Sequence, residues 1–268
     1  MAIEVTSIGS SSSGNSYIIR TSSSTLILDV GLTMKRIIGA LNDSGISPED
    51  VKAVMLTHEH VDHVRSVRAI GRKCCNAVVL ASRGTARHTP YFDSIPEERV
   101  MLVGAGEIVE LGDVTVKVFS LSHDASEPVG FSVEADGEVL TIVTDTGIIT
   151  DEIYAAIRES DLLVLEANHD EELLMFGEYP YSLKVRIKGD HGHLSNKTAG
   201  EVLAQALADT GRKPDIMLAH LSEHNNAPFY ARYTIEGILQ ENGFVRDEDY
   251  TLTIAGKDDI CIMGRTLR

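Results

Sequence analysis

Long apolar runs and a basic N-terminal leader are both missing from this sequence. No apolar stretch approaches the roughly 20 residues that an α-helix needs to cross a bilayer. The first residues, Met1 to Val5, contain neither a basic segment nor an apolar core, so they do not resemble a secretory signal. We therefore expect a protein that neither spans a membrane nor is secreted.

Cysteine is scarce, with only three residues in the chain. Cys74 and Cys75 are neighbours, Cys261 is far from both, and the total is odd, so a disulfide framework is not expected. A second cysteine pair at the spacing of a zinc finger is also missing, which disfavours a cysteine-bound metal. These features predict free thiols and a reducing cytoplasm.

Positive charge is in short supply. The chain has 24 Lys and Arg residues against 40 Asp and Glu residues, which gives a formal net charge of −16. Proteins that coat nucleic acid usually carry the opposite sign. Broad electrostatic binding to a polyanion is therefore disfavoured. A local basic rim around a metal site is still compatible with this charge, because the metals themselves supply positive charge.

The hydrophobic pattern predicts alternating groups of strands and helices, in which helices cover the outer faces of sheets. One domain over residues 1–268 is the simplest organisation. The expected strands are Val5–Gly9, Ser16–Arg20, Thr25–Asp29, Val51–Leu56, Ala77–Ala81, Val114–Leu121, Val129–Glu134, Val139–Val143, Leu162–Glu166, Ile216–His220, Tyr250–Ile254 and Ile260–Met263. The expected helices are Met34–Asn42, Val64–Lys73, Asp151–Glu159, Asn196–Thr210 and Arg232–Gly243.

A dense histidine motif, Thr57-His-Glu-His-Val-Asp-His63, directly follows the apolar strand Val51–Leu56. In an extended segment alternate side chains point the same way, so His58 and His60 can bind one ion. The chain must then turn, which brings Asp62 and His63 to a second ion beside the first. Imidazole and carboxylate ligands together suit Zn²⁺, Mn²⁺ or Fe²⁺ better than Ca²⁺ or Mg²⁺.

This motif resembles the signature of the metallo-β-lactamase fold superfamily. The resemblance implies an α/β (α+β) fold, a four-layer αββα sandwich, with two divalent metal ions at the edge of the sheets. The family pattern also includes a lone histidine, a bridging aspartate and a last histidine. The matching residues here are His123 in Leu121-Ser-His-Asp124, Asp145 in Thr144-Asp-Thr-Gly147, and His220 in Leu218-Ala-His-Leu-Ser222. His224 competes with His220 for the last position, and His220 is preferred because it stands at the end of an apolar strand.

The resemblance implies one metal bound by His58, His60 and His123, and another bound by Asp62, His63 and His220, with Asp145 between them. Two cations that share an oxygen lower the pKa of bound water and so provide a hydroxide nucleophile near neutral pH. Asp29 matches the first motif of the fold, where it is expected to orient ligating residues.

The histidine motif alone does not choose a substrate. Diiron flavoprotein relatives carry Glu at the position of His60 and add a flavin domain, and neither feature is found here. A carboxylic-ester, thioester or lactone hydrolase is the alternative reading. Three later segments favour a phosphodiesterase, because they resemble motifs of the tRNA 3′-processing nucleases. They are Leu165-Glu-Ala-Asn-His-Asp170, Gly192-His-Leu-Ser-Asn196 and His220-Leu-Ser222.

Taken together, the motifs resemble the YycJ/WalJ branch of the superfamily along nearly the full chain. This resemblance implies a cytoplasmic 5′-to-3′ DNA exonuclease that is linked to repair and acts on DNA ends. It also implies that His193 protonates the leaving oxygen, with His169 or Glu166 to orient it, and that Asp62 belongs to the catalytic set. Ser10–Ser13 is either a phosphate-binding loop or an ordinary polar turn.

Overall fold

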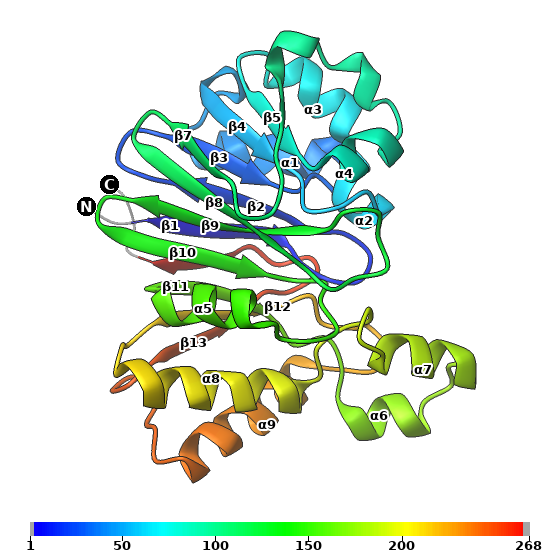
Figure 1. The fold of residues 1–268 in the computed structure, drawn as a ribbon, viewed down its shortest axis with the longest axis vertical. Coiled ribbons are helices and arrows are strands. Elements are labelled where there is room, and N and C mark those ends of the chain that lie inside the picture. Colours follow the sequence, from blue (N-terminus) through cyan, green and yellow to red (C-terminus); the bar gives the residue numbers. More distant parts are fainter. Residues whose placement is uncertain (1–2, 265–268) are drawn as a thin grey trace.

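Two stacked, seven-stranded β-sheets form the centre of the protein in the computed structural model, which describes residues 3–264 (Figure 1). The first sheet has the strand order β14-β1-β2-β3-β4-β5-β6, and the second has the order β13-β12-β11-β10-β9-β8-β7. Strands β3 to β6 are parallel, as are β10 to β13, whereas the remaining pairs are antiparallel. Each sheet therefore has a parallel half and an antiparallel half.

The strands are short, and most are buried. Those of the first sheet are β1 (Glu4–Gly9), β2 (Ser16–Arg20), β3 (Thr25–Leu28), β4 (Val51–Met55), β5 (Val78–Ala81), β6 (Val100–Leu102) and β14 (Cys261–Gly264). Those of the second sheet are β7 (Ile108–Leu111), β8 (Val114–Ser120), β9 (Val129–Ala135), β10 (Glu138–Val143), β11 (Leu162–Glu166), β12 (Asp215–Ala219) and β13 (Thr251–Ile254).

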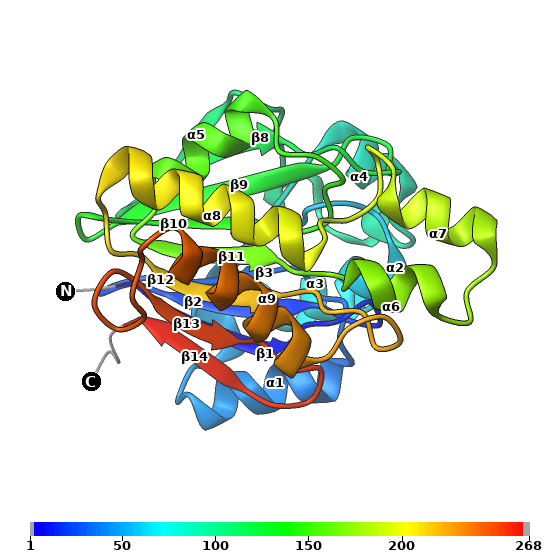
Figure 2. The ribbon, with the colours of Figure 1, turned by 90° about the horizontal axis from the view of Figure 1, so that it is seen from below.

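Nine α-helices lie within residues 3–264, outside the two sheets (Figures 1 and 2). They are α1 (Met34–Asp43), α2 (Val61–Val64), α3 (Val67–Lys73), α4 (Arg83–His88), α5 (Asp151–Glu159), α6 (Glu171–Phe176), α7 (Tyr181–Lys188), α8 (Asn196–Thr210) and α9 (Pro228–Glu241). The 3₁₀ turns η1, η2 and η3 cover Pro48–Asp50, Phe92–Ser94 and Glu97–Arg99.

Three apolar clusters hold the layers together. The central cluster lies between the sheets and includes Tyr17, Leu26 and Phe131. A second cluster packs α1 and α3 on the first sheet, and a third packs α5, α8 and α9 on the second sheet. Strands with apolar residues on both faces require cover on both sides. The predicted four-layer αββα architecture is confirmed.

The predicted strands and the other predicted helices are present with small shifts at their ends, but the helix expected over Val64–Lys73 is wrong as one element. Ser66 interrupts it, because its backbone N–H donates to the Val30 carbonyl and its hydroxyl donates to the Leu32 carbonyl. Helix α9 begins four residues earlier than expected, with Pro228 in its first turn, where proline is well tolerated.

The strands β6 and β7 and the helices α4, α6 and α7 were not predicted, nor were the first three residues of α2 and the three 3₁₀ turns. The two strands have few buried residues, and α7 has none, so their sequences carry little of the apolar periodicity that marks a buried element. Helices α6 and α7 project from the end of the sandwich in both views (Figures 1 and 2). Residues 1–2 and 265–268 of the expected 1–268 domain lie outside the described residues.

No helix in the described range, residues 3–264, combines the length and the apolar character that a membrane span requires.

Candidate metal centre

The histidine motif and the three later candidate ligands meet at one edge of the sandwich. His58 follows β4 in the first sheet, whereas His123, Asp145 and His220 follow β8, β10 and β12 in the second sheet. These strands all end at the same edge, and the carboxyl ends of parallel strands are where α/β proteins usually place their sites. Stacking the two sheets therefore brings together residues that are far apart in sequence.

A first cluster consists of His58, His60 and His123, whose ring nitrogens all lie within 4.8 Å of one another. His60 Nδ1 and His123 Nε2 are 3.3 Å apart. His123 Nδ1 lies 3.1 Å from the Gly192 carbonyl, which can only accept, so this nitrogen carries the proton. The lone pair of His123 Nε2 is then available to a metal ion.

A second cluster consists of Asp62, His63 and His220, again with one ligand atom from each residue within 4.8 Å of the others. The chain turns into α2 immediately after His60, and this turn carries Asp62 and His63. His63 Nε2 lies 3.3 Å and His220 Nε2 lies 3.8 Å from Asp62 Oδ2. Asp29 and Glu166 hold the Nδ1 atoms of these two histidines, at 2.8 and 2.7 Å.

Asp145 lies between the two clusters. Its Oδ2 is 3.3 Å from His63 Nε2, and its Oδ1 is 3.8 Å from His123 Nε2. Oδ1 also lies 3.4 Å from His220 Nδ1. One carboxylate thus faces histidines of both clusters, which suits a ligand that two cations share.

Seven buried side-chain atoms have no hydrogen-bond partner within residues 3–264, and three of them belong to candidate ligands: His58 Nε2, Asp145 Oδ2 and His220 Nε2. Buried polar atoms are almost always hydrogen-bonded, so three unpartnered atoms in one place require an explanation. All three belong to groups that could hold a metal ion, and a set of imidazoles and carboxylates suits Zn²⁺, Mn²⁺ or Fe²⁺. The residues therefore fit divalent cations.

The electrostatics of the centre attract positive charge. Burial lowers the pKa of His220, but the carboxylates of Asp145, Asp62 and Glu166 outweigh it and raise this pKa to about 10. His63 behaves in the same way, with its pKa raised well above the usual range. Burial and the neighbouring His63, His123 and His60 hold the pKa of His58 well below its usual range. A bound cation would supply the charge that these carboxylates favour.

Three of the candidate residues have a left-handed backbone conformation, namely Asp29 (φ 55°), Asp145 (φ 60°) and His220 (φ 55°). Asp29 and His220 directly follow a strand end and Asp145 lies two residues after one, where this conformation turns the chain sharply. Aspartate and histidine tolerate left-handed φ better than most residues, but any residue other than glycine is uncommon there, and such strain clusters at functional sites. Gly31 is required for a different reason, because a Cβ there would lie 1.5 Å from the Asp62 carbonyl oxygen.

Asp29 forms hydrogen bonds with two residues of the histidine motif, Thr57 and His63. Its Oδ1 accepts the backbone N–H of Thr57 at 2.9 Å, and its Oδ2 accepts the Thr57 hydroxyl at 2.9 Å. The same Oδ2 accepts a hydrogen bond from His63 Nδ1 at 2.8 Å. This contact fixes the ring and leaves Nε2 free to bind a metal, which agrees with the expected orienting role.

Asp29→Asn is expected to weaken metal binding by about 10–100-fold, because the amide NH₂ cannot accept the proton of His63 Nδ1. Asparagine tolerates left-handed φ, so the backbone need not change. The affinity for Zn²⁺ or Mn²⁺ can be measured by competition with a chromogenic chelator. Asp247→Asn, at an exposed left-handed position (φ 65°), is the matched control and should leave the affinity unchanged. Equal affinities in both variants would contradict the role of Asp29.

The Glu166 carboxylate joins His193 to the centre. Its Oε1 lies 2.8 Å from His193 Nδ1 and 2.7 Å from His220 Nδ1, and its Oε2 accepts the Leu194 backbone N–H at 3.0 Å. Burial raises the pKa of Glu166, but His193 and His220 outweigh it and lower this pKa far below its usual range. Glu166 is thus an ionised carboxylate. The His193 side chain is 20 % exposed, whereas Glu166 is fully buried.

His169 and His224 lie outside these contacts. His169 is buried, its Nδ1 has no hydrogen-bond partner in the described part of the chain, and burial lowers its pKa to about 4. The bond that orients His193 therefore comes from Glu166. The His224 ring packs against Tyr179, with ring centroids 5.6 Å apart, and His224 belongs to neither cluster. Of the two candidates for the last ligand, the structure brings only His220 to the centre.

The loop Ser10–Asn15 contacts residues of the metal centre. It contains Asn15, which the sequence analysis did not identify as a site residue. The Ser10 hydroxyl donates to Asn15 Oδ1 at 3.0 Å, and it accepts the Tyr17 hydroxyl and the His220 backbone N–H, each at 2.8 Å. It therefore has no capacity left for a phosphate. Asn15 donates its backbone N–H to the Asp62 carbonyl, and its Nδ2 lies 3.2 Å from His63 Nε2. The position of Asn15 at the end of the Ser/Gly loop is the sequence feature that could have pointed to it.

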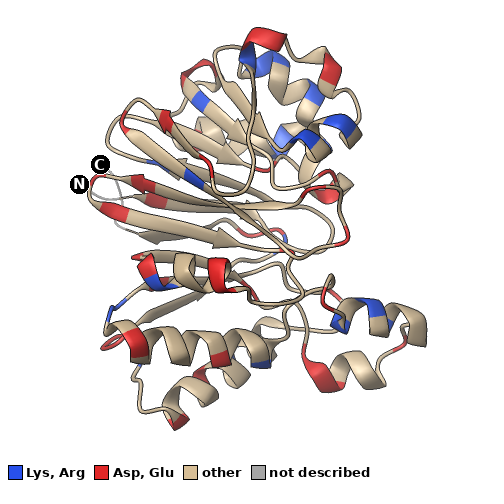
Figure 3. Cartoon of the chain, in the orientation of Figure 1, with Lys and Arg blue, Asp and Glu red and all other residues tan. Residues whose placement is uncertain are grey.

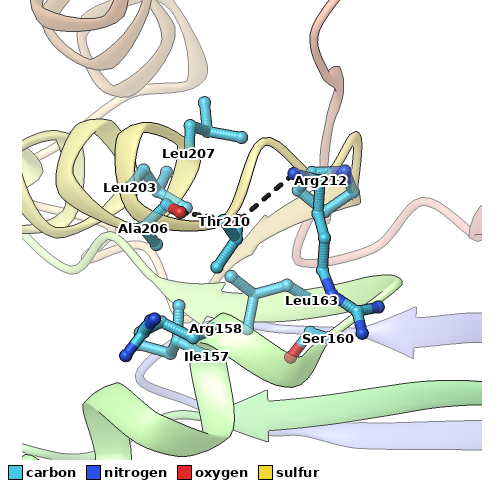
Figure 4. Close-up of a pocket in the computed structure, with 10 residues that line it drawn as sticks. Ile157, Arg158, Ser160, Leu163, Leu203, Ala206, Leu207, Thr210 and Arg212 are labelled. Carbon is cyan, nitrogen blue, oxygen red and sulfur yellow. Dashed lines mark hydrogen bonds between the residues drawn. The ribbon is translucent and has the colours of Figure 1, made fainter.

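A separate pocket lies between α5 and α8 (Figure 4). Its lining is mainly apolar, with Leu163, Leu203 and Leu207, and two arginines, Arg158 and Arg212, stand at its border (Figure 4). None of the metal-ligand clusters found among residues 3–264 includes a residue of this pocket. The chemistry of the protein is thus concentrated at the edge where the histidine motif lies.

The fold and the histidine motif define a class, and sequence comparison agrees with it. A family profile described as "Beta-lactamase superfamily domain" matches residues 40–221. The chain therefore belongs to the metallo-β-lactamase superfamily, as the motifs indicated, and is a metal-dependent hydrolase. The crystal structure of the metallo-β-lactamase fold protein YhfI from Bacillus subtilis has the same fold, with a TM-score of 0.72 and 15 % identity, over 98 % of this chain and 100 % of that chain.

Two curated relatives match most of the chain. Exodeoxyribonuclease YycJ of Bacillus anthracis is 32 % identical over 244 residues, which is 91 % of this chain and 92 % of the relative. Exodeoxyribonuclease WalJ of Streptococcus pneumoniae is 34 % identical over 237 residues, which is 87 % of each chain. The resemblance to the YycJ/WalJ branch is thereby confirmed.

Proposed function

We propose that this protein is a phosphodiesterase that uses two divalent cations and removes nucleotides from DNA ends as a 5′-to-3′ exonuclease. The observation that carries the proposal is the contact of Glu166 with both His220 and His193. It places a potential proton donor directly beside the candidate metal ligands. The two exodeoxyribonuclease relatives, which match most of the chain, support DNA as the substrate. A role in DNA repair in the cytoplasm is part of the same proposal.

The proposed ligands are those that the clusters bring together. They are His58, His60 and His123 for one cation, Asp62, His63 and His220 for the other, and Asp145 for both. Zn²⁺ and Mn²⁺ are the proposed ions, and Fe²⁺ also suits this donor set. When bound, such cations lower the pKa of water and neutralise charge on phosphoryl oxygens.

His193 is the proposed general acid. Its Nδ1 is held by the ionised Glu166, so Nε2 is the nitrogen that can deliver a proton to the leaving oxygen. Its partial exposure allows a substrate to reach it, whereas the buried Glu166 keeps the ring in place. Asp62 contributes to catalysis as a proposed ligand, and His169 remains in the proposed catalytic set without a contact to His193.

The test compares substrate classes and then DNA ends. We expect hydrolysis of bis(p-nitrophenyl) phosphate in the presence of Mn²⁺ or Zn²⁺, and no hydrolysis of thioesters or lactones. On duplex DNA labelled at either end, we expect early release of the 5′ label, with little degradation of the matching RNA. Hydrolysis of thioesters or lactones without hydrolysis of phosphodiesters would overturn the proposal. Early release of the 3′ label would overturn the polarity alone.

A further inference from the structure

A segment beside the metal centre concentrates positive charge in an otherwise acidic chain. Residues 63–92 contain six of the 24 Lys and Arg residues and no Asp or Glu. The side chains of all six are exposed, and we call the surface that they form the basic face. Its members are Arg65, Arg68, Arg72, Lys73, Arg83 and Arg87. Figure 3 shows Lys and Arg gathered on α3 and α4 at one end of the molecule.

These cations differ from others in the protein because they have no carboxylate partner. Arg186 pairs with Asp124 at 2.5 Å, and Lys257 pairs with Glu223 at 2.7 Å. Across residues 3–264, by contrast, no side chain of the basic face makes an ion pair or a hydrogen bond. Arg68 instead lies over the ring of Tyr91, 5.0 Å from its centroid. Six unpaired cations in an acidic protein repel one another, and an anionic ligand relieves that repulsion.

The helices align these charges in pairs. Arg68 and Arg72 are four residues apart on α3, and Arg83 and Arg87 are four residues apart on α4. Side chains with this spacing lie on the same side of a helix, one turn apart. Each helix thus presents two cations in a row, as binding to the regularly spaced phosphates of a nucleic-acid strand requires.

Direct contacts connect α4 to the metal centre. The backbone N–H of Ser126 donates to Glu59 Oε1 at 2.7 Å, and the Ser126 hydroxyl lies 2.8 Å from His88 Nδ1. Glu59 is part of the histidine motif, and His88 is the last residue of α4, next to Arg87. The loop with Ser126 follows His123, a candidate ligand. The basic face therefore begins at the edge of the centre rather than at a remote surface.

We infer that the basic face binds the phosphate backbone of the DNA strand whose scissile bond lies at the metal centre. This inference rests on the proposed function, and it extends that function by naming the surface that holds the substrate. The net charge of −16 opposes a tight grip elsewhere on the molecule. A local row of unpaired cations allows the enzyme to hold a strand near its end and still release it.

The test distinguishes binding of the DNA strand from hydrolysis at the metal centre. It compares a variant that lacks two cations of the basic face with a control variant that lacks two cations elsewhere. Arg83→Ala/Arg87→Ala is expected to raise KM for a long DNA duplex by about tenfold and to reduce the slope of log KM against log salt by about two. Turnover of bis(p-nitrophenyl) phosphate, which is too small to reach the basic face, should not change. Arg158→Ala/Lys213→Ala removes the same charge at the opposite edge of the sheets and should alter neither substrate.

Unchanged KM and salt slope in the α4 variant would overturn the inference, as would equal losses on both substrates. Arg68→Ala/Arg72→Ala on α3 provides a second variant with the same expected result if the α4 variant does not fold. A change of molecular mass in light scattering would show that the basic face joins copies of the chain, which would also overturn it. Failure of the proposed function looks different, because the wild-type protein itself would then release no label from DNA, whatever the basic-face variants do.

Discussion

Asp145→Asn is expected to lower turnover of a phosphodiester on the order of 10³-fold or more. The Asp145 carboxylate is buried, faces His63 in one cluster and His123 in the other, and has an oxygen with no hydrogen-bond partner among residues 3–264. An amide at this position carries no negative charge and offers one oxygen in place of two. The variant should therefore bind fewer cations, and the remaining cation would not be paired with a second one.

The measurement combines turnover of bis(p-nitrophenyl) phosphate with metal content by elemental analysis. Asparagine retains the left-handed backbone of Asp145, so a loss of activity reports on the carboxylate rather than on the turn. Asp247→Asn changes an exposed aspartate with similar φ and should keep both activity and metal content. An Asp145→Asn protein with full metal content and near-normal turnover would contradict the assignment of Asp145 as the shared ligand.

His193→Ala is expected to lower kcat on DNA by about 10²–10⁴-fold, because the leaving sugar oxygen must be protonated as the bond breaks. Glu166 holds the His193 ring beside the clusters, with Oε1 2.8 Å from His193 Nδ1. A p-nitrophenolate leaving group is stable without a proton, so bis(p-nitrophenyl) phosphate should lose far less activity. Metal content should stay at the wild-type value.

His224→Ala is the matched control for this experiment, since His224 follows His220 closely in the chain but lies outside both clusters. It should behave like the wild type on both substrates. Equal losses on DNA and on bis(p-nitrophenyl) phosphate in the His193 variant would show that His193 supports the site in another way. A variant that cleaved DNA at the full rate would remove the residue from the mechanism altogether.

The sequence predicted the αββα fold and named the residues that meet at the edge of the sheets. It could do so because each group of candidate ligands follows an apolar strand, as the histidine motif follows β4 and His220 follows β12. The hydrophobic pattern shows where each strand ends. The family resemblance then implies that the residues after these strands meet at one edge of the two sheets. The sequence favoured His220 over His224 because His220 stands at the end of an apolar strand, and His220 does directly follow β12 in the structure.

The contacts made by Glu166 could not be predicted from the sequence. Glu166 pairs with Ala219 in the parallel register of β11 and β12, and this register places its carboxylate beside His220. Strand register between distant segments is a property of the packed sheet. For the same reason the sequence offered His169 and Glu166 equally as partners of His193. The short helices α4, α6 and α7 were missed because few or none of their residues are buried.

The division of the candidate ligands between the two sheets has a thermodynamic consequence. His58 follows a strand of the first sheet, and Asp145 and His220 follow strands of the second, so neither sheet alone presents a complete set. A cation that binds the assembled set but not the unfolded chain shifts the folding equilibrium in proportion to its affinity and concentration. Ions bound at this edge would connect the two sheets and stabilise the folded state. The supply of metal in the cell would then affect the lifetime of the folded protein as well as its rate of turnover.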